Sequence, residues 1–152
     1  MPLDQAFVGR TYPPTAPYLV SREKIAEFAA AVGDANPAYT SVEAARELGH
    51  PDVVAPPTFA VLVSGRAQAQ VMFDPALGLD YSKVVHGEQS FAYQRPVVAG
   101  DRLVAVVSVE KIRSAAGNDL LTLRSEVTTA QGEPVCTVRS VVVARGTAAA
   151  EG

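Results

Sequence analysis

The 152-residue sequence has one cysteine, two histidines and no tryptophan, and the first two shortages each exclude a kind of site. A single cysteine, Cys136, allows no intrachain disulfide and no thiolate metal cluster. The two histidines, His50 and His86, are too few for a typical histidine-rich metal site. We therefore expect no bound metal and no other cofactor.

The sequence also has no excess of positive charge and no long apolar run. Thirteen Lys and Arg stand against sixteen Asp and Glu, a formal net charge of -3, and the basic residues are scattered. This balance argues against nucleic-acid binding. No apolar stretch approaches the length that spans a bilayer, and the N-terminal residues lack the basic and apolar regions of a signal peptide. We expect a cytoplasmic protein that binds neither nucleic acid nor membrane.

The composition is that of a compact domain, with 48% hydrophobic and 19% charged residues. The length suits one domain with its own core. We expect a single domain over residues 1–146 and a flexible tail of small and polar residues over 147–152.

Two helices are predicted in the first third of the chain. Apolar residues recur with helical spacing between Ile25 and Val32, Ser21 is placed to cap this helix, and Gly33 is placed to end it. Thr40 and Glu43 have the spacing of a capping box for a second, short helix. The loop from Asp34 to Tyr39 is thus held between two helices.

A third helix is predicted over Thr58–Phe73. Residues 50–57 contain three prolines and cannot be helical, whereas Pro57 suits the first turn of the helix that follows. The apolar residues of this helix do not alternate with polar ones, and several residues are small. We therefore expect it to be buried nearly all round against a sheet.

The remainder of the chain has the pattern of long strands separated by turns. The four predicted strands are Val84–Arg95, Arg102–Arg113, Leu120–Ala130 and Pro134–Arg145. One long helix followed by an antiparallel meander indicates an α+β fold in which a curled sheet wraps the helix. The open edge of such a sheet commonly pairs with another subunit.

Several motifs follow one another in order along the chain. They are Gly33-Asp34-x-Asn36-Pro37, Ala45, Ala55-Pro56-Pro57-Thr58-Phe59, Val63-Ser64-Gly65, His86-Gly87-Glu88-Gln89 and Arg95-Pro96-Val97-x-x-Gly100-Asp101. Together these motifs resemble the MaoC-like (R)-specific hydratase and dehydratase family of hot-dog proteins. The similarity is to its single-domain branch, related to the N-terminal dehydratase domain of fungal-type fatty acid synthase and to actinobacterial (3R)-hydroxyacyl-ACP dehydratase subunits.

The resemblance implies an acid–base reaction at the Asp34 loop. Dehydrating a 3-hydroxyacyl thioester needs a base near the C2 proton and an acid near the departing hydroxyl. In the family, an Asp and a His of the motif Asp-x-Asn-Pro-x-His perform this task. Asp34 matches the aspartate, but Tyr39 stands at the histidine position, and a phenol with a pKa near ~10 is a poor base at neutral pH. His86 is the candidate to replace the missing base.

The resemblance further implies substrate contacts, each with a structural alternative. The candidate substrate-binding residues are Asn36, Pro57, Thr58, Ser64, Gly87 and Glu88. Asn36 can instead organise the loop, and Ser64 can allow tight helix–sheet packing. The helix start at Pro57 and Thr58 can support the thioester carbonyl through its dipole. His86 and Glu88, two residues apart, are expected on one face of their strand, where they can also bond across a subunit boundary.

Three functions remain open from the sequence. The first is an acyl-ACP- or acyl-CoA-binding subunit of a heterodimeric dehydratase whose histidine-bearing hot-dog partner supplies the Asp/His pair, as occurs in this branch. The second is a self-sufficient homodimeric hydratase that uses Asp34 with His86 or Tyr39. The third is a non-enzymatic acyl-CoA-binding module. Thioester hydrolysis fits the Asp-x-Asn-Pro loop less well, and fold alone does not fix the reaction.

Overall fold

In the computed structural model, which describes residues 2–147, five antiparallel strands form one sheet in the order β1-β3-β4-β5-β2. The strands are β1 Tyr18–Leu19, β2 Val84–Tyr93, β3 Arg102–Ala115, β4 Asn118–Thr129 and β5 Pro134–Ala144. The four long strands lie within a few residues of the predicted bounds. Their 10 to 14 residues make them longer than most strands. The predicted α+β fold with an antiparallel sheet is thereby confirmed. The predicted meander is wrong, because β2 crosses over to pair with β5 instead of with β3, the next strand along the chain.

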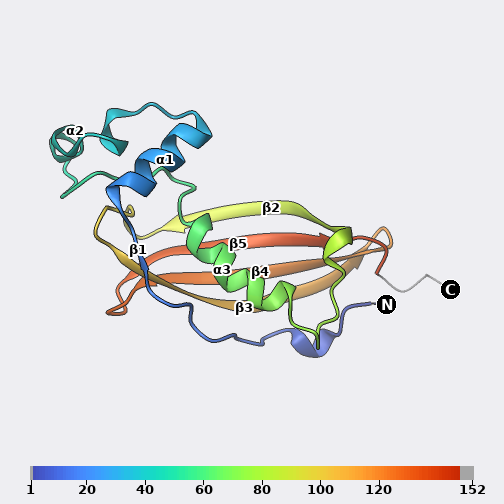
Figure 1. Cartoon of the computed structure of the whole chain (residues 1–152). Coiled ribbons are helices and arrows are strands. Elements are labelled where there is room, and N and C mark those ends of the chain that lie inside the picture. The colour runs from blue at the N-terminus through green and yellow to red at the C-terminus, as the bar shows by residue number, and fades with distance from the viewer. Residues whose placement is uncertain (1, 148–152) are drawn as a thin grey trace.

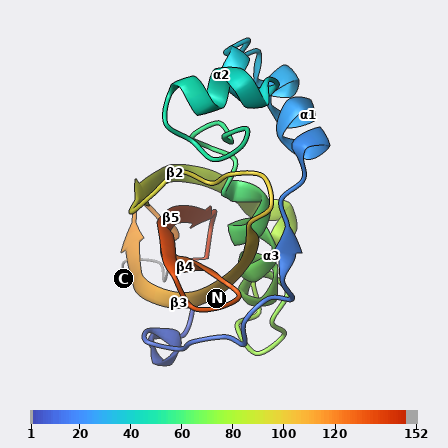
Figure 2. The ribbon, with the colours of Figure 1, turned by 90° about the vertical axis from the view of Figure 1, so that its left-hand side faces the viewer.

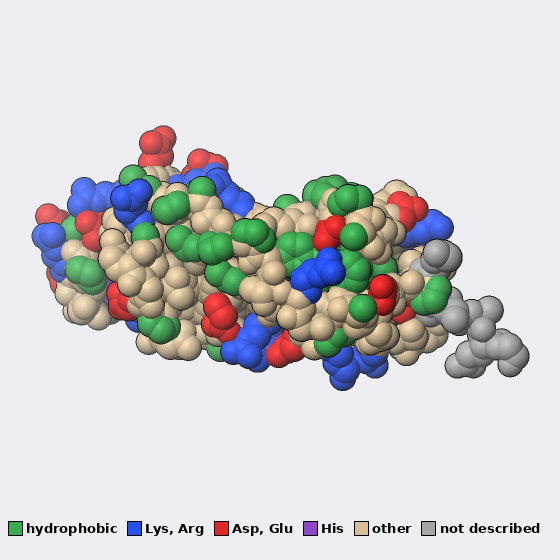
Figure 3. All heavy atoms as spheres, turned by 90° about the horizontal axis from the view of Figure 1, so that it is seen from below, with side chains coloured by type: hydrophobic (Ala, Val, Ile, Leu, Met, Phe, Trp, Pro, Cys, Tyr) green, Lys and Arg blue, Asp and Glu red, His purple; other side chains and the backbone are tan. Residues whose placement is uncertain are grey.

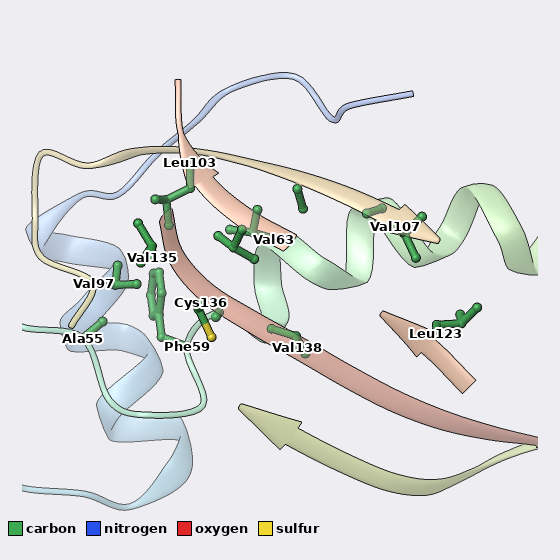
Figure 4. Packing of buried hydrophobic residues seen from close by; sticks show 14 of the residues in the cluster. Ala55, Phe59, Val63, Val97, Leu103, Val107, Leu123, Val135, Cys136 and Val138 are labelled. Carbon is green, nitrogen blue, oxygen red and sulfur yellow. The ribbon is translucent and has the colours of Figure 1, made fainter. Parts of the chain in front are cut away.

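The sheet curls around helix α3, which spans Val61–Met72 (Figures 1 and 2). Alternate residues of β3, β4 and β5 are buried, so one face of each strand points toward the helix. Figure 4 shows Phe59, from the turn before α3, lying with Val135 and Cys136 of β5. Cys136 is a buried free thiol, as expected of a small core residue.

Two expectations about α3 are wrong. The helix begins at Val61 rather than Thr58, because residues 56–60 form tighter turns, such as Phe59 N–H to the Pro56 carbonyl at 3.0 Å. The helix is also not buried all round. Ala67 is completely buried, whereas Val61 and Gly65 are exposed and line a groove between α3 and β2.

A helical cap lies at one end of the sheet and contains α1 (Arg22–Val32) and α2 (Val42–Glu47) (Figure 1). Ser21 caps α1 by accepting the Lys24 N–H, and Gly33 ends it in the left-handed conformation with φ 74°, as predicted. The predicted capping box of α2 is wrong by one residue. Ser41, not Thr40, accepts the Ala44 N–H, because Thr40 already ends the short 3₁₀ turn Pro37–Tyr39.

Strand β2 is a sheet edge, because among the described residues it pairs only with β5. Its pairing slips at Gly87, so that His86 faces Val142 while Glu88 faces Val141. This bulge shifts the alternation of side chains by one residue. The expectation that His86 and Glu88 share one face is therefore wrong. A Cβ at position 87 would lie 3.2 Å from the Val143 side chain and 3.3 Å from the Val141 carbonyl oxygen, so glycine relieves crowding at this bulge.

Buried Asp119 ties the N-terminal segment to the far end of the sheet. Its carboxylate accepts hydrogen bonds from the Leu3 N–H at 2.9 Å, the Ser114 hydroxyl at 2.6 Å and the Thr147 hydroxyl at 2.8 Å. Burial alone would raise the pKa of Asp119, but these donors outweigh it and lower the pKa. Thr147 is thus held in place, whereas residues 148–152 of the predicted flexible tail lie outside the described residues.

The lowered pKa of Asp119 predicts a pH-dependent stability. Its contribution is complete above the ordinary pKa of 3.8 and is lost as pH falls through the lower folded-state pKa. We expect Asp119→Asn to lower the free energy of unfolding by about 1.5–3 kcal/mol at neutral pH. Urea unfolding at several pH values measures this loss. The difference from wild type should shrink on acidification, whereas exposed Glu27→Gln should show little difference at any pH. A pH-independent difference would contradict the assignment.

Candidate active site and acyl pocket

The Asp34–Tyr39 loop is ordered by its own side chains. One Asp34 carboxylate oxygen accepts the Asn36 N–H at 3.2 Å, and the Asn36 side-chain oxygen Oδ1 accepts the Ala38 N–H at 3.0 Å. These are Asx-type bonds, which hold a chain reversal without regular helix or sheet. Asn36 therefore organises the loop, as its structural alternative predicted. Its substrate-binding role stays a prediction.

Tyr39 points back to Asp34 across this loop. Its hydroxyl donates to the second Asp34 carboxylate oxygen at 3.2 Å, and its ring is only 8% exposed. Burial raises the pKa of Tyr39, and the charge and hydrogen bond of Asp34 raise it further. The phenol is therefore protonated at neutral pH and donates to Asp34. The pair contains one carboxylate and no base of histidine type.

A largely apolar pocket of about 470 Å³ lies between the cap and the end of β2. One wall comes from the cap, including Tyr39 and Leu48, and the other from the end of β2 and the loop before β3, including Tyr93. The remaining lining residues are Asn36, Ala38, His50, Val54, Ala55, Pro57, Gln94, Arg95, Pro96 and Val97. Apolar walls with a few polar groups are typical of small-molecule pockets. We call this space the cap pocket.

The lining contains residues that the sequence did not indicate. His50, in the proline-rich segment before α3, is half-buried and lines the cap pocket. The Tyr93 hydroxyl donates to the Pro57 carbonyl at 2.6 Å and ties the two walls together. Pro57 itself lines the pocket, whereas Thr58 is exposed in the turn beside it. No local motif marks His50 or Tyr93, because these residues meet only when the cap folds against the sheet.

The first backbone N–H groups of α3 are already hydrogen-bonded. The N–H groups of Val61, Leu62 and Val63 bond to the carbonyls of Thr58, Phe59 and Ala60 at 3.1 Å each. These first-turn donors are thus already used within the turn that precedes the helix. These three groups are therefore not free to donate to a thioester carbonyl, and support of the carbonyl by the helix start at Pro57 and Thr58 stays a prediction.

The other predicted site residues lie away from the cap pocket. His86 lines a groove of about 350 Å³ between α3 and β2. Glu88 lines a separate hollow on the outer face of the sheet. Ser64 is completely buried, and its hydroxyl has no hydrogen-bond partner among the described residues. Gly87 forms the bulge between His86 and Glu88. The chain therefore does not bring His86 and Asp34 into one pocket.

Arg95 has a structural role at the rim of the cap pocket. Its guanidinium donates to both carboxylate oxygens of Asp101, at 2.9 and 3.0 Å, and to Glu133 at 2.8 Å. A guanidinium used in this way stabilises the loop before β3.

The surface charge is mixed. On the face of the molecule seen from below, Lys and Arg side chains are interspersed with Asp and Glu, without a large area of one sign (Figure 3).

Among residues 2–147, no group of three or more His, Cys, Asp or Glu side chains could hold a metal ion. None of the helices over residues 2–147 is long and apolar enough to cross a bilayer.

A curled antiparallel sheet wrapped around one helix, with a cap over its end, defines a hot-dog protein. The chain belongs to the FAS1-like, dehydratase domain region family, whose pattern matches residues 6–138. It is 61% identical over 148 residues to a UPF0336 protein of Saccharopolyspora erythraea, covering 97% of this chain and 95% of that one. A UPF0336 protein of Streptomyces coelicolor is 62% identical over 145 residues, covering 95% and 97% respectively.

Solved structures agree with this assignment. The HadBC (3R-hydroxyacyl-ACP dehydratase) complex of Mycobacterium tuberculosis contains a chain with a TM-score of 0.81 and 31% identity, covering 90% of this chain and 96% of that one. A MaoC-like dehydratase matches with a TM-score of 0.86 and 38% identity, over 93% of this chain and 43% of that one. The ChsH1-ChsH2 complex of M. tuberculosis, at 20% identity and a TM-score of 0.68, shows the shared fold.

Proposed function

We propose that this protein is the acyl-thioester-binding subunit of a (3R)-hydroxyacyl dehydratase whose partner subunit supplies the acid–base pair. One observation carries the proposal: the family's histidine position holds a buried phenol that donates to Asp34 at 3.2 Å. The reaction removes the C2 proton and expels the C3 hydroxyl as water, leaving a trans-2-enoyl thioester. A protonated phenol cannot remove that proton, and His86 lies in another groove.

The cap pocket supports the acyl-binding half of the proposal. Its walls are largely apolar, with Leu48, Val54 and Val97 among them, and it opens beside the Asp34 loop. A hydrocarbon chain placed there gains about 0.8 kcal/mol for each buried methylene. The position suits a substrate whose tail lies in this chain and whose thioester end lies against a partner.

The free edge of β2 supports the proposed association with a partner subunit. An unpaired strand edge invites pairing with another chain. The groove beside it is lined by exposed apolar side chains, including Val61, Phe73 and Tyr81. Two structural neighbours are heteromeric complexes by name, HadBC and ChsH1-ChsH2. We propose that a histidine-bearing hot-dog subunit pairs with β2 and covers this groove.

Co-expression with a hot-dog homologue that carries Asp-x-Asn-Pro-x-His tests the pairing. We expect the two chains to co-purify as one complex.

The backbone N–H of Gln89 points toward the free edge of β2. The Gln94 N–H bonds the Val135 carbonyl of β5, and N–H groups of an antiparallel strand point alternately to its two sides. Gln89, five residues earlier, therefore points its N–H away from β5.

Gln89→Pro removes that outward donor without removing a bond to β5, so we expect the complex to weaken or disappear on size-exclusion chromatography. Gln89→Ala, the matched control, should still form the complex. Failure of the wild-type chains to associate would reject the heteromeric function. A complex that acyl-CoA stabilises against heat without any turnover would favour a non-enzymatic binding module.

A further inference from the structure

The two sides of the sheet end differently. Strand β2 forms one edge, and among residues 2–147 it pairs only with β5. On the other side lies β3, whose first two residues, Arg102 and Leu103, pair with the two-residue strand β1. Residues 5–15 run along the rest of β3 (Figure 1). We call residues 5–15 the N-terminal strap.

The N-terminal strap occupies the outward backbone groups of β3. The Gly9 N–H donates to the Val109 carbonyl at 2.8 Å, and the Val109 N–H donates to the Arg10 carbonyl at 2.9 Å. The Tyr12 N–H donates to the Val107 carbonyl at 3.0 Å. These are backbone bonds of the kind that a neighbouring strand would make, so they compete directly with pairing by another chain.

Thr15 and Gln5 complete this coverage with their side chains. The Thr15 N–H donates to the Ala105 carbonyl at 3.0 Å, and Thr15 Oγ1 accepts the Ala105 N–H at 3.0 Å. The Gln5 side-chain amide donates to the Ile112 carbonyl at 3.1 Å, beyond the bulge of β3. Together with β1, the N-terminal strap therefore bonds the edge of β3 at intervals from Leu103 to Ile112.

The N-terminal strap is itself a poor template for a further strand. Pro13 and Pro14 lack the backbone N–H that an added strand would bond, and prolines are a common means of ending a sheet. Strand β2 contains no proline, and its residues 85–90 are exposed. The β3 side of the sheet is thus closed to pairing, whereas the β2 side is open.

We propose that the N-terminal strap limits strand pairing by this chain to one neighbour, the subunit that joins β2. A sheet with two open edges can be extended from both sides, and repeated head-to-tail pairing then builds filaments. A chain with one open edge can only end such a sheet. The inference rests on the proposed pairing at β2 and adds a reason why the complex stays finite.

Two double variants of the full chain separate edge coverage from side-chain anchoring. Tyr12→Pro/Thr15→Pro removes two backbone donors of the N-terminal strap and the Thr15 hydroxyl, so backbone groups of Ala105 and Val107 become free. Tyr12→Phe/Thr15→Ser is the matched control. It loses the bond from the Tyr12 hydroxyl to Asp74 at 2.7 Å but keeps both backbone donors and a hydroxyl at position 15.

Circular dichroism establishes that each variant is folded, and Thr15→Pro alone replaces the proline double variant if the latter does not fold. Amide hydrogen exchange at Ala105 reports release of the edge, and light scattering after size-exclusion chromatography gives the mass. The Ala105 amide should exchange at least about tenfold faster in the proline variant than in the control. The proline variant should also form species larger than wild type that grow with protein concentration, whereas the control should keep the wild-type mass.

A folded proline variant that keeps the wild-type mass, or whose Ala105 amide stays protected, would overturn the role of the N-terminal strap. Each form is measured alone and with the histidine-bearing homologue. If the homologue does not bind wild type, the heteromeric function fails. Growth of the proline variant alone would still support the role of the N-terminal strap, because successive copies can pair β2 with the opened β3.

Discussion

In the complex, replacing the partner's motif histidine by alanine is expected to lower kcat by about 10²–10⁴-fold, the usual contribution of a general acid–base residue. Asp34→Asn in this chain should change kcat only a few fold, because Asp34 here accepts hydrogen bonds from Tyr39 and the Asn36 backbone. Initial rates of crotonyl-CoA hydration by the purified complexes give both values.

The comparison separates two ways of building the enzyme. If Asp34 supplied the chemistry together with His86, then Asp34→Asn would cause the large loss and the partner's histidine would matter little. The two residues line different spaces in the chain, which argues against that pairing within one subunit. A large loss in both variants would mean that the chains share one catalytic site, and would contradict the division of roles proposed here.

Phe59→Ala is expected to lower the free energy of unfolding by about 3–5 kcal/mol. Phe59 is completely buried and meets Phe28 of α1 edge to face, with ring centroids 5.4 Å apart. Its removal leaves a cavity where the cap, α3 and the sheet meet. Because several elements border this cavity, a shift of any one of them cannot fill it. Urea unfolding followed by circular dichroism measures the change.

Phe73→Ala is the matched control, because Phe73 has the same side chain but is 66% exposed in the isolated chain. Its effect should stay within about 0.5 kcal/mol. Equal effects of the two substitutions would show that Phe59 is not the junction of cap and core that the structure indicates.

Local chemistry made much of the fold predictable from sequence. The long strands follow from apolar alternation between turn residues, and the ends of α1 follow from Ser21 and Gly33. The errors arise where two local signals compete. Thr40 and Ser41 are both good caps, and only the turn at Pro37–Tyr39, which uses Thr40 as its end, decides between them.

Features that depend on distant contacts were not predictable in this way. The bulge at Gly87 is defined only by its pairing with β5, although the glycine itself is visible in the sequence. The cap pocket joins Leu48 and His50 to Gln94 and Pro96, which are far apart in the chain. Asp34 and Tyr39 were singled out by their motif, but the hydrogen bond between them required the folded loop.

In the proposed function, this chain binds the acyl group and lacks its own acid–base pair. Hydration of crotonyl-CoA, followed as loss of the enoyl-thioester absorbance, tests both points when the chain alone is compared with the complex. The chain alone should show no turnover, and the complex should show clear turnover. Turnover by the purified chain alone, abolished by Asp34→Ala, would contradict it.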